Sequence, residues 1–295
     1  MAQETLVLKL APGEHATLRR RLAAEDFEFR TVPHAKFSVK GPQIVATLYQ
    51  SGKLVIQGAD PALFAARFVP GAVRPAAPPA REELSEATRI GSDECGKGDY
   101  FGPLVVAAVR LDPATARALA GGEVADSKQL DDATALRLGA ALRGRVPYSV
   151  ARLDPPDYNR AYAAAGKGRL NDLLADLHAR AIRALHEPGV HVLIDKFANE
   201  RLMRERLADL DLELEQRTRA ERFIAVAAAS VIAREEFLRA LAALSEEHAV
   251  DLHKGAGAPV DRAGAGFVRL HGVEKLGAVA KLHFKNTAKI RARVG

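Results

Sequence analysis

The fold is decided by residues 91–109, which read GSDECGKGDYFGPLVVAAV. Two adjacent carboxylates, Asp93 and Glu94, close an extended segment, a glycine-rich turn follows, and an apolar run then starts a second strand. Neighbouring strand residues point to opposite faces, so Asp93 and Glu94 converge on one metal ion only if Glu94 sits where the strand ends. Gly96 and Gly98 allow the chain to turn there, because glycine accepts positive φ.

A carboxylate pair beside exposed backbone N–H groups suits a metal ion that handles a phosphate. The alternative is a solvated turn, which is what most Asp-Glu pairs form. The pair alone does not decide between these two interpretations, and the remainder of the chain has to.

Composition bounds the class of protein. A chain of 295 residues suggests two domains or one large domain, and 48% hydrophobic with 27% charged residues is typical of globular proteins. The net charge of +6 allows a polyanionic partner. A single cysteine, Cys95, excludes an internal disulfide and fits a reducing compartment. We expect a cytoplasmic monomer without a membrane segment.

The N-terminal part, residues 1–69, has the pattern of a small α+β domain. Strands are predicted at residues 5–10, 27–32 and 36–39, a hairpin with a Ser-Gly turn at 44–58, and helices at 15–24 and 61–68. Up to Ala80 the chain carries 4 Lys and 6 Arg against 6 acidic residues, so the positive charge density is highest here. Residues 70–84, rich in Pro and Ala, are predicted to form a linker.

Residues 85–295 have an α/β pattern and form the predicted catalytic domain. Strands are expected at residues 89–94, 104–111, 148–153, 190–195 and 212–216, and helices near 132–142, at 170–186 and at 220–244, with basic helical pieces in the tail from 264. Two of these strands end in an acid, Asp93 and Asp195. Parallel neighbours would bring both carboxylates to one sheet edge, with Glu221 opposite them in the first turn of the long helix.

Five ordered motifs carry a resemblance to a known family: GSDECGKGDYFGPLVVAA, ADSKQL, VLIDKF, RAERFIAVAAASVIAR and AKLHFKNTAK. Over residues 88–295 the chain resembles the bacterial ribonuclease HIII family, a branch of the type 2 RNases H. Residues 1–69 resemble one half of a TATA-box-binding protein. An ordinary α+β module that contacts proteins is the alternative for that part. The fold implied is an RNase H-like mixed five-stranded sheet flanked by helices, plus a small α+β N-terminal domain like that of the TATA-box-binding protein.

The resemblance implies four catalytic and metal-binding acids, Asp93, Glu94, Asp195 and Glu221. The sister family, ribonuclease HII, usually has Asp at the fourth position and Gly-Arg-Gly at the turn. This chain has Glu221 and Lys97 there, which favours ribonuclease HIII. Cys95 stands where a small aliphatic residue is more usual, and we interpret it as a buried small side chain.

The implied activity is that of an endoribonuclease that hydrolyses the RNA strand of RNA–DNA hybrids with two Mg²⁺ or Mn²⁺ ions and leaves 5′-phosphate and 3′-hydroxyl ends. By the same resemblance, the backbone of Gly96, Lys97 and Gly98 contacts 2′-hydroxyls, and Lys97 can add a phosphate contact. Three further substrate contacts are implied, at Ser127, Lys128 and Ser230. Each of those three also has a structural alternative: a turn serine, a solvated lysine and a helix-packing serine.

Other residues are left with open roles. His283 and Lys285 lie in a family motif to which the sequence assigns no function, and His178 and His191 lie in apolar patterns that indicate core or boundary positions. Candidates for the nucleic-acid face of the small domain are Tyr49, Phe37 and Lys53. The rival functions are incision at single ribonucleotides in DNA, as in ribonuclease HII, and non-catalytic nucleic-acid binding.

Overall fold

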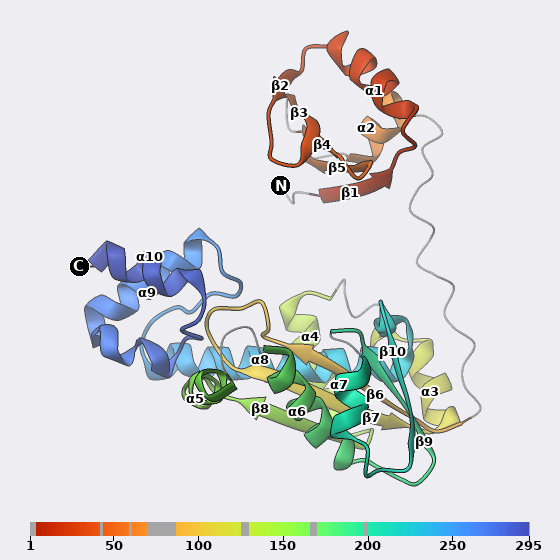
Figure 1. Cartoon of the computed structure of the whole chain (residues 1–295), viewed down its shortest axis with the longest axis vertical. Helices are drawn as coiled ribbons and strands as arrows, with labels where there is room; N and C mark the ends of the chain where they lie inside the picture. Colours follow the sequence, from red (N-terminus) through yellow and green to blue (C-terminus); the bar gives the residue numbers. More distant parts are fainter. Residues whose placement is uncertain are drawn as a thin grey trace. The chain divides into compact units, whose positions relative to one another are not determined.

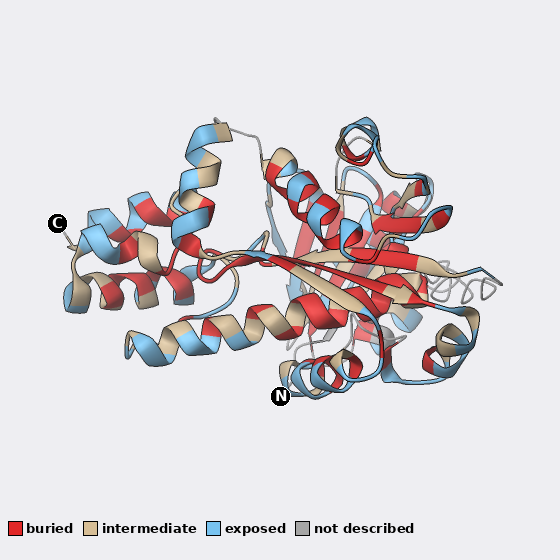
Figure 2. Cartoon of the chain, turned by 90° about the horizontal axis from the view of Figure 1, so that it is seen from below, coloured by how far each residue is buried: buried red, intermediate tan, exposed pale blue. Residues whose placement is uncertain are grey.

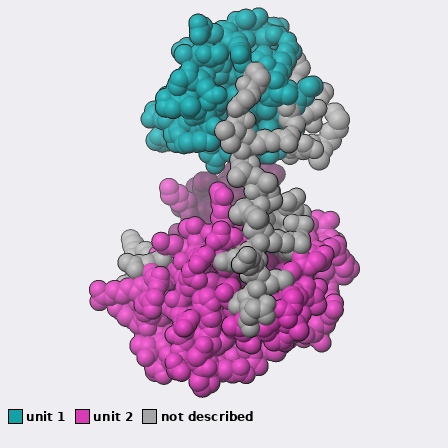
Figure 3. Space-filling model, turned by 90° about the vertical axis from the view of Figure 1, so that its right-hand side faces the viewer, with its two compact units in different colours: residues 1–81 teal, residues 82–295 magenta. Residues whose placement is uncertain are grey.

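The chain forms two compact units, residues 1–81 (unit 1) and residues 82–295 (unit 2), which Figure 3 colours separately. The predicted linker lies outside the described residues. The computed structural model describes residues 4–41, 44–58, 61–69, 87–124, 130–165, 170–197 and 200–294.

Unit 1 is an antiparallel five-stranded sheet with two helices (Figure 1). Its elements are β1 (Glu4–Lys9), α1 (Glu14–Ala23), β2 (Glu28–Arg30), β3 (Ala35–Gly41), β4 (Ile44–Tyr49), β5 (Lys53–Gly58) and α2 (Pro61–Phe68). The strands lie in the order β1-β5-β4-β3-β2. The predicted hairpin joins β4 to β5, and Gly52 at its turn has φ +80, a conformation that glycine adopts without strain.

The two helices cover one face of the unit 1 sheet. The apolar side chains of the strands that point to this face pack against Leu18 and Leu22 of α1 and against Phe64 and Phe68 of α2. Phe37 belongs to this core and is only 7% exposed. Its predicted place on a nucleic-acid face is therefore wrong, because strand register, which the sequence does not fix, turns it inward.

The opposite face of that sheet is covered by neither α1 nor α2 and carries basic side chains. Lys9 of β1 lies directly across from Lys53 of β5, and Arg30 of β2 lies across from Ser38 of β3. Tyr49 and Lys53 both belong to this face by the alternation of their strands. We call it the open face of unit 1.

Unit 2 is built on a mixed five-stranded sheet, as the resemblance implied. Its strands are β6 (Arg89–Cys95), β7 (Leu104–Leu111), β8 (Tyr148–Leu153), β9 (Val190–Asp195) and β10 (Leu212–Arg217), in the order β10-β9-β6-β7-β8. β9 pairs parallel with both β6 and β10, whereas β7 pairs antiparallel with β6 and β8. All five strands were predicted, within one residue at each end.

Helices cover both faces of this sheet, and each face has its own apolar core. The elements are α3 (Pro113–Ala120), α4 (Asp132–Arg143), α5 (Pro155–Ala165), α6 (Leu170–Arg183), α7 (Glu200–Arg206), α8 (Ile224–Glu247), α9 (Ala258–His271) and α10 (Lys285–Val294), with 3₁₀ turns η2 (Ala220–Arg222) and η3 (Val273–Ala278). One core joins the sheet to α8 and α4, and the other joins it to α6 and α7. Figure 2 shows buried strands between helices whose outer sides are exposed. The sequence analysis did not predict α3, α5 and α7.

Helix α8 packs closely on the sheet because both elements carry small side chains where they meet. A Cβ atom at Gly91 would lie 2.2 Å from the backbone carbon of Ala225 and 2.3 Å from the nitrogen of Val226. The Ala-rich centre predicted for this helix is fully buried. Any larger side chain at Gly91 would push α8 away from the strand that carries Asp93.

Ion pairs link α8 to α4 and to the sheet strand β8. Glu235 is 1% exposed and accepts from Arg143 Nε at 2.8 Å and from Arg239 at 3.3 Å. Glu236 on the next position pairs with Arg143 and with Arg152 of β8. Truncation of Arg143 would leave Glu235 as a poorly compensated buried charge.

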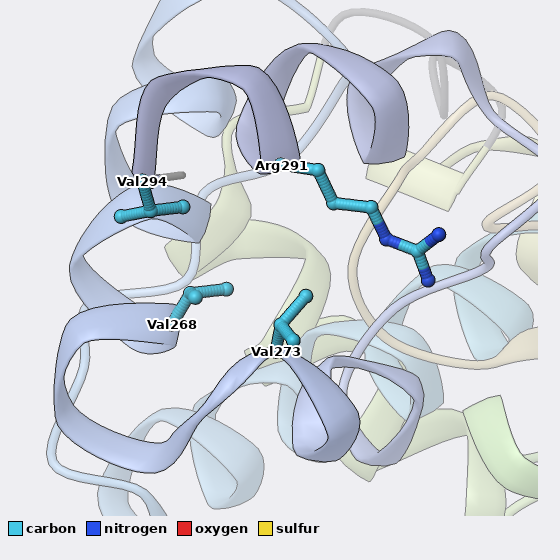
Figure 4. Close-up of a pocket in the computed structure, with 4 residues that line it drawn as sticks. All are labelled: Val268, Val273, Arg291 and Val294. Atoms are coloured by element: carbon cyan, nitrogen blue, oxygen red, sulfur yellow. The ribbon is translucent and has the colours of Figure 1, made fainter.

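The C-terminal helices line an open pocket. Val268, Val273, Arg291 and Val294 line this space of about 440 Å³ between α9, η3 and α10 (Figure 4). Its lining contains no acidic residue. Across the described residues, no helix is both long and apolar enough to cross a bilayer.

Candidate active site

The acidic strand ends meet at one edge of the unit 2 sheet. β6 and β9 run parallel, and their register pairs Ser92 with Ile194, so the next residues along the two strands are Asp93 and Asp195. Both point to the side of the sheet that α8 covers, as do Gly91 and Leu193, which contact α8. The parallel pairing of β6 with β9 therefore puts these two carboxylates side by side.

Asp93 is half-buried, and its carboxyl group lies close to two other acidic side chains. Its Oδ1 accepts the backbone N–H of Glu94 at 2.8 Å, and the hydroxyl group of Ser230 on α8 donates to it. Burial, with the charges of Glu94 and Asp195, raises the pKa of Asp93 to about 7, although the two hydrogen bonds oppose the rise. Such a group favours a nearby cation.

Glu94 points to the opposite side of β6. The strand continues through Cys95, so Glu94 is not at its last residue, and the expectation that the strand ends at Glu94 is wrong. Oε1 of Glu94 lies 3.4 Å from Nζ of Lys97, and Oε2 lies 3.5 Å from Nε2 of His178. Burial raises the pKa of Glu94, but His178 and Lys97 outweigh burial and hold the pKa below its ordinary value.

His178 of α6 was predicted to be a core or boundary residue, and it is buried, but the sequence analysis did not predict its contact with Glu94. It is fully buried, its Nδ1 lies 2.7 Å from Oγ of Ser92, and its ring stacks on Phe197 at 4.8 Å between centroids. It thus touches the residue before Asp93 and the residue two after Asp195. The available signal was a polar residue within an apolar helical stripe, since a buried imidazole needs polar partners.

Asp195 is the last residue of β9, and Glu221 lies in the turn η2 that follows β10. Oδ1 of Asp195 accepts the backbone N–H of Ala220 at 2.9 Å, which fixes the turn η2 against the end of β9. Glu221 lies within η2, and α8 begins only at Ile224, so its expected position in the first turn of the long helix is wrong. Arg219 makes the separate turn with φ 60, a left-handed conformation unusual for a residue with a side chain.

The glycine turn after β6 is tightly packed at one residue and open at another. Gly96 has φ +89, and a Cβ atom there would lie 2.2 Å from the carbonyl oxygen of Pro103. Gly98 is exposed, and a Cβ atom there would meet nothing within 4 Å. Lys97 between them lies over the ring of Phe197 at 5.9 Å. The turn therefore presents an open backbone next to Glu94.

Of the three further substrate contacts that the resemblance implies, the structure describes only Ser230. Ser127 and Lys128 lie outside the described residues. Ser230 is half-buried, and its hydroxyl group bonds to Asp93. Cys95 is half-buried against the α8 core, and burial raises the pKa of its thiol to about 12, which keeps it protonated and inert.

The C-terminal motif, which the sequence left without a role, holds the loop that follows the turn. Lys281 is fully buried and donates through Nζ to the carbonyl oxygens of Phe101, Gly102 and Pro103. His283 stacks on Tyr162 at 4.3 Å and is therefore a packing residue. A lysine within an apolar motif was the signal that pointed to such an anchor.

The four acids are not gathered into a closed cage. In the described parts of the chain, no three His, Cys, Asp or Glu side chains converge closely enough to hold a metal ion. The donors at this edge are carboxylate oxygens, which suit Mg²⁺ or Mn²⁺ better than zinc. The raised pKa of Asp93 marks the negative charge that a divalent cation would neutralise.

Comparisons with known proteins match this chain to ribonucleases. The family model described as Ribonuclease HII matches residues 90–287, and a domain of unknown function matches residues 5–77. A protein of Chlamydia abortus named "Ribonuclease HIII" is 38% identical over 96% of this chain and 96% of its own length. The protein of that name from Protochlamydia amoebophila is 36% identical over 99% of this chain and 97% of its own.

A solved structure extends the similarity to the fold of the whole chain. It is titled "Crystal structure of Bst-RNase HIII in complex with Mn2+", is 35% identical, and covers 99% of both chains with a TM-score of 0.65. The match therefore includes unit 1 as well as unit 2.

Proposed function

Because this chain belongs to the ribonuclease HIII family of metal-dependent ribonuclease H endonucleases, we propose that its substrate is the RNA strand of an RNA–DNA hybrid. Cleavage leaves a 5′-phosphate and a 3′-hydroxyl group. The observation that carries this proposal is the half-buried Asp93 carboxyl group, whose pKa is raised to about 7 and which lies just before an open glycine turn. The Asp93 carboxyl group, which a cation would stabilise in its charged form, thus lies beside a backbone turn that a ribose can approach.

Asp93, Glu94, Asp195 and Glu221 are the proposed metal-binding and catalytic residues. When bound, two divalent ions, Mg²⁺ or Mn²⁺, supply a nucleophilic water at neutral pH and stabilise charge on the phosphate oxygens. Asp93 and Asp195 lie on one side of the sheet and would hold the ions there. Glu94 and Glu221 would complete the set of carboxylate ligands.

The chain's own hydrogen bonds orient these carboxylates. The N–H of Ala220 holds Asp195, and the Ser230 hydroxyl group with the N–H of Glu94 holds Asp93. Lys97 and His178 flank the two oxygens of Glu94. Ser230, which the resemblance implies to be a substrate contact, thus also orients a carboxylate of the site.

Substrate selection belongs to the backbone of Gly96, Lys97 and Gly98. The 2′-hydroxyl group distinguishes RNA from DNA, and exposed backbone groups of the turn can contact it on more than one ribose. Ser127 and Lys128 are proposed phosphate contacts. The basic open face of unit 1 adds further phosphate contacts and so raises affinity for the hybrid. We place this activity in the cytoplasm and in a monomer.

One finding favours a second candidate, incision at a single ribonucleotide in duplex DNA: the matching family model is described as Ribonuclease HII. Lys97 at the turn and Glu221 favour the first candidate. The deciding experiment compares initial rates, in the same metal, on a hybrid with an all-RNA strand and on a DNA duplex with one ribonucleotide. We expect efficient cleavage of the hybrid and little at the single site. Comparable rates would move the assignment to the sister activity.

A further inference from the structure

Gly96, the first residue of the turn, rests on a single carbonyl group of the following loop. The 2.2 Å separation between a Cβ built at Gly96 and the carbonyl oxygen of Pro103 means that the Gly96 backbone lies against that oxygen. The same Cβ position lies 3.0 Å from a ring carbon of Phe237 of α8. The location of the Pro103 carbonyl group therefore sets where the turn lies.

The same carbonyl group is held by Lys281. Nζ of Lys281 lies 3.2 Å from the oxygen of Pro103, 2.5 Å from that of Gly102 and 3.4 Å from that of Phe101. An ammonium group has three N–H donors, and these three carbonyl groups match them in number. The side chain is fully buried, and burial lowers the pKa of Lys281 to about 8.

The backbone around Lys281 is fixed to the same loop on both sides. The N–H of Lys281 donates to the oxygen of Tyr100 at 2.8 Å, and the N–H of Gly102 donates to the oxygen of Val279 at 3.0 Å. Asn159 of α5 holds the segment from outside through the oxygen of Ala280. Hydrogen bonds on both sides of Lys281 therefore fix its backbone against the loop of residues 100–103.

We propose that Lys281 is a positioning residue that sets the geometry of the Gly96–Gly98 turn and, through it, the discrimination between ribose and deoxyribose. The proposal rests on the proposed function, because it assigns the 2′-hydroxyl contact to that turn. A buried cation held by backbone carbonyl groups keeps them aligned, whereas an apolar side chain leaves three buried acceptors without donors and free to reorient. The turn packed on Pro103 then shifts with them.

The test measures ribose discrimination in Lys281→Met. Discrimination is the ratio of kcat/KM on a hybrid with an all-RNA strand to kcat/KM on the same hybrid with 2′-deoxyribose at the nucleotides flanking the cut. Rates are normalised to the folded fraction. We expect the variant to lose about 10- to 100-fold in kcat/KM on the all-RNA strand, because small misplacements of a positioning group have that effect. The discrimination ratio should fall at least about threefold, since the deoxy strand has less turn contact to lose.

Two matched variants separate positioning from stability and from charge. Ile290→Ala opens a cavity in the core between α9 and α10 without touching the turn, so it should lower the melting temperature and leave the ratio unchanged. Lys289→Met removes an exposed lysine of the same motif and should leave both unchanged. Lys281→Gln, which keeps one donor, should give an intermediate ratio, and it replaces the methionine variant if that variant does not fold.

The possible outcomes are distinct. A Lys281→Met protein that melts earlier, like Ile290→Ala, but keeps the wild-type ratio would make Lys281 a structural residue and overturn the proposal. A wild-type enzyme with no preference for ribose would instead refute the proposed function.

Discussion

The two five-stranded sheets of this chain differ in which part of the sheet is left free. In unit 1 the strands are antiparallel, helices cover one face, and the other face carries Lys9, Lys53 and Arg30. In unit 2 helices cover both faces, and the carboxylates stand at the edge where the parallel strands β6 and β9 end. The difference teaches that the basic face suits a long charged backbone, whereas the acidic edge suits a single reacting phosphate.

The largest effect is expected from a change at the acidic edge. Asp195→Asn should keep the fold and hybrid binding while cleavage falls by about a thousandfold or more, because a metal ligand worth several kcal/mol in the transition state is lost. The measurement is single-turnover cleavage in Mg²⁺ and in Mn²⁺, with binding measured separately. Near-normal cleavage would contradict the four-carboxylate site.

Deletion of residues 1–80 tests the basic face as a whole. We expect affinity for the hybrid to fall by roughly 10- to 100-fold while cleavage at saturating substrate changes little, since phosphate contacts contribute to binding rather than to chemistry. Affinity measured at several salt concentrations should also show a flatter dependence on salt. Unchanged affinity and slope would assign unit 1 to another task, such as protein contacts.

Burial and the neighbouring carboxylates should make the charged Asp93 lower the free energy of unfolding, and Asp93→Asn measures this effect. The pKa of Asp93 is about 7 in the folded protein against an ordinary 3.8, so the folded state retains its proton where the unfolded chain has lost it. Stability is then highest below about pH 4 and falls as the pH rises to about 7. Without metal, Asp93→Asn should be more stable than wild type at pH 8 by about 2–4 kcal/mol.

This gain should shrink to about 0.5 kcal/mol at pH 4, where Asp93 is protonated in the folded state and close to half protonated in the unfolded chain. Denaturant unfolding at pH 4 and pH 8, with and without Mn²⁺, measures it. Added Mn²⁺ should stabilise the wild type more than the variant. A variant less stable than wild type at pH 8 would mean that the carboxylate is not under repulsion.

The smallest expected effect belongs to two residues of the open face. Lys9→Gln with Lys53→Gln, which face each other across β1 and β5, should weaken hybrid binding about three- to tenfold and reduce the salt slope by up to about two. Arg19→Gln with Arg20→Gln removes the same charge from exposed positions of α1 and should change binding much less. Equal effects of the two pairs would mean that net charge, and not this face, binds the hybrid.

The sequence by itself determined the strands of unit 2, the hairpin of unit 1, the long helix and the family, because alternating and 3.6-residue apolar patterns are local and the motifs are contiguous. The tertiary structure decided what depends on residues far apart in the chain. Strand register turned Phe37 inward, and a 3₁₀ turn separated Glu221 from α8. His178 reached Glu94, and Lys281 reached the carbonyl groups around Pro103, across about 80 and 180 residues of sequence. A pattern of neighbours specifies which face of an element is buried, but the atom that a buried polar group meets is fixed only when the elements pack.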